Sequence, residues 1–174
     1  CVKFLDFIYL NNCDGVIVQD LGLASIIKCR YPNLRLHAST QINAQTYDDV
    51  ITLKRLGFDR VILGREVSLD SIKDIRNKLN ENAIKMELEV FAHGALCISY
   101  SGSCYFSSMI GGRSGNRGRC AQPCRREYSF NGKNGYYLSP KDLETIDYIM
   151  DRTKDGNNGV LNICLNYGGR AEIV

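Results

Sequence analysis

The sequence predicts an α/β protein in which a parallel βα repeat, about half of a barrel, is followed by a cysteine- and glycine-rich loop segment. Short apolar runs typical of buried parallel strands recur about every 20–27 residues in the first half of the chain. Stretches with helical spacing separate these runs, which is the rhythm of a parallel sheet or a TIM-barrel-like fold. Six glycines and four cysteines then gather within residues 94–128. A complete eight-unit barrel needs about 250 residues, so the four units present make a partial, half barrel.

The individual elements follow from local sequence signals. The chain opens in a helix, and further helices are expected at residues 21–30, 46–56 and 69–79. Pro32 breaks the first of these, Gly57 provides a C-terminal cap for the second, and Ser68 is an N-cap for the third. Strands are expected at residues 15–19, 34–38, 60–64 and 86–91.

These elements divide the chain into three parts. Residues 1–93 are the partial βα barrel, residues 94–149 a cysteine-rich segment with a hairpin and a helix, and residues 150–174 an unrelated tail. Because the chain begins with Cys1 inside a helix, we interpret its first residue as a truncation point.

The fourth strand carries two carboxylates in an alternating pattern. Met86, Leu88 and Val90 are expected to face the helices, which leaves Glu87 and Glu89 pointing to the interior. Carboxylates inside a barrel are unfavourable unless they are paired, so they often mark the working interior. A structural salt bridge is the alternative.

In barrels of this kind the chemistry lies at the carboxyl ends of the strands. Candidate catalytic residues there are Glu89, His37 and His93, and candidate substrate-binding residues are Gln41 and Arg65. Each histidine taken alone is more often structural than catalytic.

The net charge of +3 does not by itself indicate a nucleic-acid partner. Five arginines nevertheless lie close together without an acid between them, and three of them are candidate contacts to RNA phosphates: Arg113, Arg117 and Arg119, with Arg125 and Arg126 nearby. The alternative is a solvated basic loop. No apolar run reaches the roughly 18–20 residues of a membrane span, so no membrane partner is expected.

Four of the eight cysteines follow the pattern C-x6-C-x15-C-x3-C, at Cys97, Cys104, Cys120 and Cys124. With no export signal we expect a cytoplasmic protein, where clustered cysteines are more often metal ligands or catalysts than disulfides. Structural zinc sites favour C-x2–4-C pairs, whereas iron–sulfur clusters accept more varied spacing. A metal or cluster site is therefore favoured, and free or buried cysteines remain the alternative.

The residues around these cysteines resemble the signature of peptidase family U32. The resemblance rests on Glu89-Val90-Phe91, Gly94-Ala95-Leu96-Cys97, Gly102-Ser103-Cys104 and the run from Met109 to Arg125. It also includes Val18-Gln19-Asp20, His37-Ala38-Ser39-Thr40-Gln41 and Leu138-Ser139-Pro140-Lys141-Asp142-Leu143, and extends over about residues 1–149.

This resemblance implies more than one activity. The family's name records collagenase-like proteolysis, whereas several members are tRNA or rRNA hydroxylases and others take part in oxygen-independent quinone hydroxylation. Cysteines of this region hold a [4Fe–4S] cluster in the family, which implies the same cofactor here. Some members have a further cysteine after Lys-Asp-Leu, where this chain has Glu144.

The residues favour hydroxylase over protease. The sequence contains neither a His-Glu-x-x-His nor a Gly-x-Ser-x-Gly motif. A cysteine nucleophile would have His93 near Cys97, but that would explain one cysteine, whereas a cluster explains four. We therefore predict an iron–sulfur-dependent RNA hydroxylase-like enzyme, with an endopeptidase acting on peptides and a non-catalytic RNA-binding scaffold as alternatives.

The tail has a different character. Residues 151–174, and Asn166-Tyr167-Gly168-Gly169-Arg170 in particular, resemble a piece of a cis-prenyltransferase such as undecaprenyl diphosphate synthase. That resemblance implies that Asn166 and Arg170 match positions near a diphosphate site. An ordinary terminal strand is the alternative, and we expect no prenyl transfer by this chain.

Overall fold

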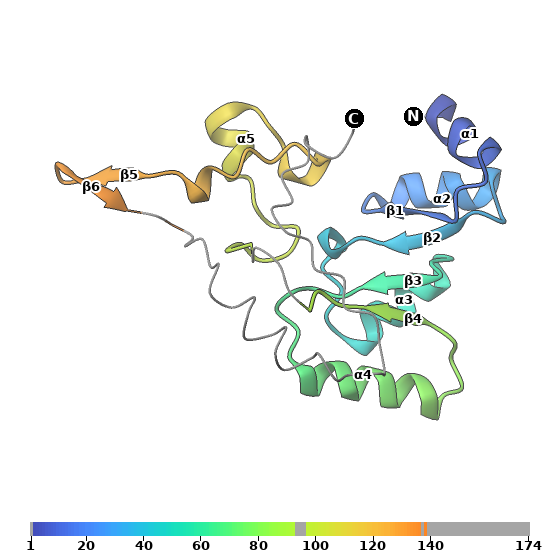
Figure 1. Cartoon of the computed structure of the whole chain (residues 1–174). Coiled ribbons are helices and arrows are strands. Elements are labelled where there is room, and N and C mark those ends of the chain that lie inside the picture. Colours follow the sequence, from blue (N-terminus) through green and yellow to red (C-terminus); the bar gives the residue numbers. More distant parts are fainter. Residues whose placement is uncertain (1, 93–96, 137, 139–174) are drawn as a thin grey trace, which may run out of the picture. The chain divides into compact units, whose positions relative to one another are not determined.

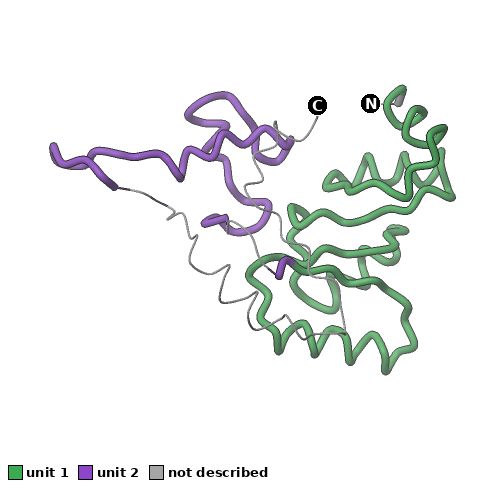
Figure 2. Tube along the Cα trace, in the orientation of Figure 1, with its two compact units in different colours: residues 1–90 green, residues 91–174 purple. Residues whose placement is uncertain are grey.

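The computed structural model describes residues 2–92, 97–136 and 138 (Figure 1). The chain forms two compact units, residues 1–90 and residues 91–174, and each is described by itself (Figure 2). The predicted boundary at residue 150 and the tail beyond it lie outside the described residues. Within the described part, no helix is long and apolar enough to cross a membrane.

The first unit is a parallel sheet of four strands in the order β1-β2-β3-β4. The strands are β1 (Gly15–Val18), β2 (Arg35–Ala38), β3 (Arg60–Ile62) and β4 (Glu87–Glu89). Helices alternate with them along the chain: α1 (Val2–Leu10), α2 (Leu21–Arg30), α3 (Tyr47–Arg55) and α4 (Leu69–Glu81). This confirms the predicted α/β class and the partial TIM-barrel-like βα repeat (Figure 1).

Side chains at the predicted boundaries cap the helices. Thr46 is the N-cap of α3, where it forms a reciprocal capping box with Asp49. The Ser68 hydroxyl accepts from the Ser71 N–H at the start of α4, as predicted. Gly57 follows α3 with a φ of +90°, a conformation that favours glycine. Local hydrogen bonding therefore sets the limits of these elements.

The hydrophobic core lies between the sheet and its helices. It includes Val18, Leu36 and Val61 from the strands, and Ile27 and Leu79 from α2 and α4. Met86 is also buried in this core and Leu88 packs against it, as the alternating pattern predicts, whereas Val90, beyond the end of β4, is exposed. The other face of the sheet is consequently free for polar side chains.

The described part of the second unit has little apolar interior. Its elements are α5 (Phe106–Gly111), two short 3-10 turns (Gly115–Arg117 and Pro123–Arg125) and a hairpin of β5 (Tyr128–Phe130) and β6 (Lys133–Tyr136). Polar contacts hold the loops together: the Ser107 hydroxyl accepts from the Ala121 N–H at 2.9 Å, and Asn116 donates to the Gly102 carbonyl at 3.2 Å. Ser101 and Ser107 are buried.

Candidate functional site

An ionic network covers the polar face of the sheet. Arg60 donates to Glu87 at 2.7 Å and to Glu89 at 3.0 Å, and Arg35 contacts the other oxygen of Glu87 at 2.5 Å. The hydrogen bond from Arg60 and then that from Arg35 hold the pKa of Glu87 below its usual value. Glu87 and Glu89 lie away from the helices, as predicted. Both form ion pairs with arginine, which agrees with the alternative of a structural salt bridge.

His37 lies on the same face, opposite Ile17 of β1 and Arg60 of β3 in the strand register. Its Nε2 atom is buried and has no hydrogen-bond partner among the described residues. A Cβ added at Gly15 would lie 3.3 Å from this atom, so the glycine leaves room for the ring. Burial lowers the pKa of His37, and the charges of Arg60 and Arg35 lower it further. His37 is therefore a neutral imidazole near neutral pH, and its Nε2 atom can accept a hydrogen bond or take up a proton.

We expect His37 to make folding stability depend on pH below about 6.5. Its folded-state pKa lies below the unfolded value of about 6.5, so the unfolded chain takes up the proton first. Stability is then full above pH 6.5 and falls as the pH drops toward the folded-state pKa. Denaturant unfolding of wild type and His37→Gln below about pH 6.5 measures the slope, and the variant should lack the part that His37 contributes.

His93→Gln is the matched control, since His37 and His93 are the two histidines of the chain. Wild type and His37→Gln share every other titratable group, so the difference between their two curves isolates His37. Parallel curves for wild type and His37→Gln would show that His37 is not held neutral by folding.

The loops after the strands bring further polar groups to the carboxyl ends. After β2, a 3-10 turn (Thr40–Ile42) ends at Asn43, which has a φ of 64° and accepts a hydrogen bond from Gln45 at 2.6 Å. Gly64, after β3, is closely approached: an added Cβ would lie 2.8 Å from the Glu66 carboxylate and 3.3 Å from the Asn43 side chain. The predicted residues Gln41 and Arg65 are half-buried in these two loops. The Gln19 side-chain oxygen, after β1, is buried without a partner in the described part of the chain.

The four predicted cysteines are free thiols in the second unit; Cys97 and Cys120 are exposed, and Cys104 and Cys124 are half-buried. Burial raises the pKa of Cys124, negative charge on the Cys97 and Cys120 thiolates raises it further, and the charge of Arg125 lowers it. Charge on Cys97 or Cys120 is therefore felt at the Cys124 sulfur. The Gln122 N–H also donates to the Cys120 sulfur at 3.3 Å.

These donors suit a soft metal, because thiolates are the usual ligands of iron–sulfur clusters and backbone N–H groups tune such sulfurs. Among the described residues, however, no three His, Cys, Asp or Glu side chains are arranged as a metal-binding group. The convergence of all four cysteines on one cluster stays a prediction. His93 lies outside the described residues, so its geometry toward Cys97 is not described either.

Charge is distributed unevenly between the two units. Residues 1–90 contain twelve Lys or Arg and twelve Asp or Glu, whereas residues 91–138 contain six Lys or Arg and a single acid, Glu127. Arg113, Arg117 and Arg119 form no ion pair with any residue that the structure describes. The described part of the second unit thus carries a surplus of positive charge.

Exposed aromatic rings accompany this charge. Phe130 and Tyr136 of the hairpin are 65% and 46% exposed and meet edge to face, with ring centroids 6.2 Å apart. The turn between their strands contains Asn131 and Gly132, both with positive φ. Asn-Gly between two strands is a strong hairpin signal, and it could have located these rings from the sequence.

Sequence comparison connects these features to known proteins. Residues 1–158 match the sequence model of the family described as Peptidase family U32. The chain belongs to peptidase family U32. The predicted resemblance is confirmed, whereas the resemblance of residues 151–174 to a cis-prenyltransferase is not supported by this match and stays a prediction.

Members of the U32 family with different names are similar to this chain. It is 40% identical to a 23S rRNA 5-hydroxycytidine synthase of Escherichia coli over 159 residues, which are 91% of this chain and 23% of the relative. It is 41% identical to tRNA hydroxylation protein P of the same organism, over 67% of this chain and 25% of the relative. It is 35% identical to a collagenase of Porphyromonas gingivalis, over 78% of this chain and 36% of the relative. The chain thus spans between about a quarter and about a third of the length of these relatives.

Proposed function

We propose that this chain is part of an iron–sulfur-dependent RNA hydroxylase-like enzyme. The observation that carries the proposal is a set of four free cysteines, Cys97, Cys104, Cys120 and Cys124, within a unit that has a strong surplus of positive charge. The relatives named for rRNA and tRNA hydroxylation support the substrate class. Cytoplasmic location is part of the same proposal.

The roles of the residues follow from their chemistry. Cys97, Cys104, Cys120 and Cys124 would hold the [4Fe–4S] cluster, which supplies one-electron transfer when it is bound. Arginines of the second unit bind RNA phosphates, and the rings of Phe130 and Tyr136 stack on unpaired bases. In the first unit, His37 offers a neutral imidazole that can take a proton, and the ion pairs of Arg60 hold the strands around it.

Endopeptidase activity is the second candidate, and the collagenase relative is the observation that favours it. A protease needs a nucleophile beside its base. No described residue supplies His37 with such a partner, because its Nε2 atom makes no hydrogen bond within the described part.

Anaerobic purification tests the proposal directly. We expect the protein to contain iron and acid-labile sulfide in equal amounts, and RNA from cells that express it to gain one oxygen on a pyrimidine, measured by nucleoside mass spectrometry. Iron-free protein that cleaves gelatin or casein would contradict the hydroxylase and support the peptidase. Iron-free protein that binds RNA without changing it would support a scaffold.

A further inference from the structure

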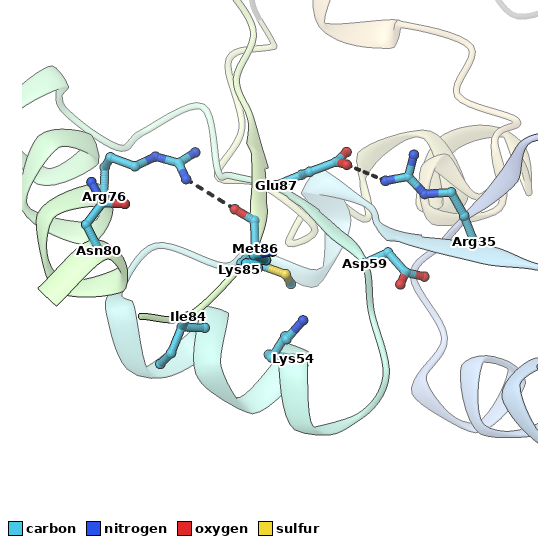
Figure 3. Close-up of a pocket in the computed structure, with 9 residues that line it drawn as sticks. All are labelled: Arg35, Lys54, Asp59, Arg76, Asn80, Ile84, Lys85, Met86 and Glu87. Carbon is cyan, nitrogen blue, oxygen red and sulfur yellow. Dashed lines mark hydrogen bonds and ion pairs between the residues drawn. The ribbon is translucent and has the colours of Figure 1, made fainter. Parts of the chain in front are cut away.

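A hollow of about 510 Å³ lies at the amino ends of the strands, away from the carboxyl-end loops described above (Figure 3). Arg35 and Glu87, the first residues of β2 and β4, line it together with Asp59, which directly precedes β3. Lys54 of α3, Arg76 of α4 and Lys85 of the loop before β4 complete its charged lining. Four of these six side chains are basic and two are acidic.

Both acids of the hollow are already paired. Glu87 accepts from Arg35 and Arg60, as described above. Asp59 accepts from Lys28 at 3.0 Å and from the Leu36 N–H at 2.9 Å. The negative charges of the lining are therefore neutralised by groups other than Lys54, Arg76 and Lys85.

The three remaining cations have no carboxylate partner among the described residues. Arg76 is half-buried, and one of its nitrogens donates to the Met86 carbonyl at 3.2 Å, which holds the guanidinium toward the hollow (Figure 3). Its other N–H groups have no hydrogen-bond partner among the residues that the structure describes. Lys54 and Lys85 come from separate segments on the same hollow.

Other lysines of α4 behave differently. Lys73 is 3.6 Å from Asp70, and Lys78 is 2.8 Å from Asp74, each one helical turn away. Neither of these two lysines lines the hollow. Lys73 and Lys78 of α4 thus each have an acidic partner outside the hollow, whereas Arg76, which faces the hollow, has none among the described residues.

We propose that this hollow binds a phosphate group. Three uncompensated cations from three segments match a dianion, and the planar guanidinium of Arg76 suits two oxygens of a phosphate. The phosphate belongs either to an RNA backbone or to a small phosphorylated molecule, which share this chemistry. The inference does not depend on the proposed cluster, because every residue involved lies in the first unit.

Calorimetric titration of the protein with inorganic phosphate tests this site. We expect Lys54→Gln/Lys85→Gln to bind phosphate at least about tenfold more weakly than wild type, since two charge-assisted contacts are lost. The matched control, Lys73→Gln/Lys78→Gln, removes the same charge from α4 outside the hollow and should change affinity less than about twofold. Thermal unfolding confirms that both variants remain folded.

Competition with a short RNA separates the two sources. RNA that displaces phosphate from wild type, and binds more weakly to the Lys54→Gln/Lys85→Gln variant, assigns the site to RNA backbone. RNA that leaves phosphate binding unchanged assigns it to a small phosphorylated ligand. Phosphate affinity that falls equally in both double variants, or in neither, would overturn the proposal.

Discussion

Serine at Cys97, Cys104 or Cys120 is expected to remove bound iron and RNA hydroxylation together. A serine hydroxyl stays protonated at neutral pH and is a poor ligand for iron, so loss of one thiolate opens the cluster to solvent. We expect the iron content of the purified protein to fall to background. The oxygen gain of the RNA should fall to the level in cells that lack the protein. Iron and sulfide analysis, visible absorbance and nucleoside mass spectrometry measure the two losses on the same preparations.

Cys13 and Cys29 provide the controls for this series. Both are exposed free thiols of the first unit, and neither belongs to the cysteine-rich segment. Serine at either position should leave iron and activity unchanged. Full iron content in Cys97→Ser, Cys104→Ser and Cys120→Ser would remove the cluster from the proposal.

Cys124→Ser is the variant that identifies the fourth ligand. Cys124 is half-buried, which raises its pKa, and the charges of Cys97 and Cys120 raise it further. If it binds iron, its serine variant should lose the cluster as the other three do. If the variant keeps its iron, the fourth ligand comes from elsewhere, and Glu144 is the residue to exchange next.

The same variants distinguish a cysteine protease from a cluster enzyme. A cysteine protease uses a single nucleophilic cysteine with its base, so Cys97→Ser should abolish peptide cleavage while serine at Cys104, Cys120 and Cys124 is tolerated. Gelatin turnover by iron-free protein that is lost only in Cys97→Ser would restore the peptidase. Joint loss of iron and RNA hydroxylation in all four variants excludes that role.

Local signals made most of the fold predictable. Thr46, Gly57 and Ser68 marked the helix ends correctly because capping depends on a few neighbouring residues. The strands are shorter than predicted: β4 covers Glu87–Glu89, where the apolar pattern indicated residues 86–91. Apolar alternation continues past the point where hydrogen bonding between strands ends, so it overestimates strand length.

The ion pairs between residues far apart in the chain could not be predicted from the sequence. Alternation predicted that Glu87 and Glu89 point away from the helices, but Arg35 and Arg60, the partners of Glu87, lie 52 and 27 residues from it. Their contact depends on the register of three parallel strands, which no local pattern specifies. The relative positions of the four cysteines are even harder to predict, because loops rather than regular strands connect them.

Removal of two arginines from the second unit is expected to weaken RNA binding and flatten its salt dependence. Arg117 and Arg119 are exposed, and their charges have no acidic partner among the described residues. Each phosphate contact to single-stranded nucleic acid contributes about 0.7 to the slope of log affinity against log salt. Arg117→Gln/Arg119→Gln should therefore lower the slope by about 1.4 and the affinity by roughly 25-fold at 0.1 M salt.

Arg30→Gln/Arg55→Gln is the matched control, because it removes two positive charges from the first unit, where basic and acidic residues balance. Its salt slope should equal that of wild type. Filter binding or fluorescence anisotropy over a series of salt concentrations gives the slope for each protein. An unchanged slope in Arg117→Gln/Arg119→Gln would leave the arginine patch as a solvated loop.

Phe130→Ala separates stacking from charge in the same assay. A base that stacks on an exposed ring contributes about 1–3 kcal/mol, and this term does not depend on counterion release. The variant should lose affinity for unpaired RNA while keeping the wild-type salt slope, and it should bind duplex RNA as wild type does. A lower salt slope in Arg117→Gln/Arg119→Gln, together with an unchanged slope and weaker binding of unpaired RNA in Phe130→Ala, would show that different residues bind the phosphates and the unpaired bases. Equal weakening for duplex and unpaired RNA in Phe130→Ala would instead mean that the hairpin supports the fold of the second unit and does not contact bases.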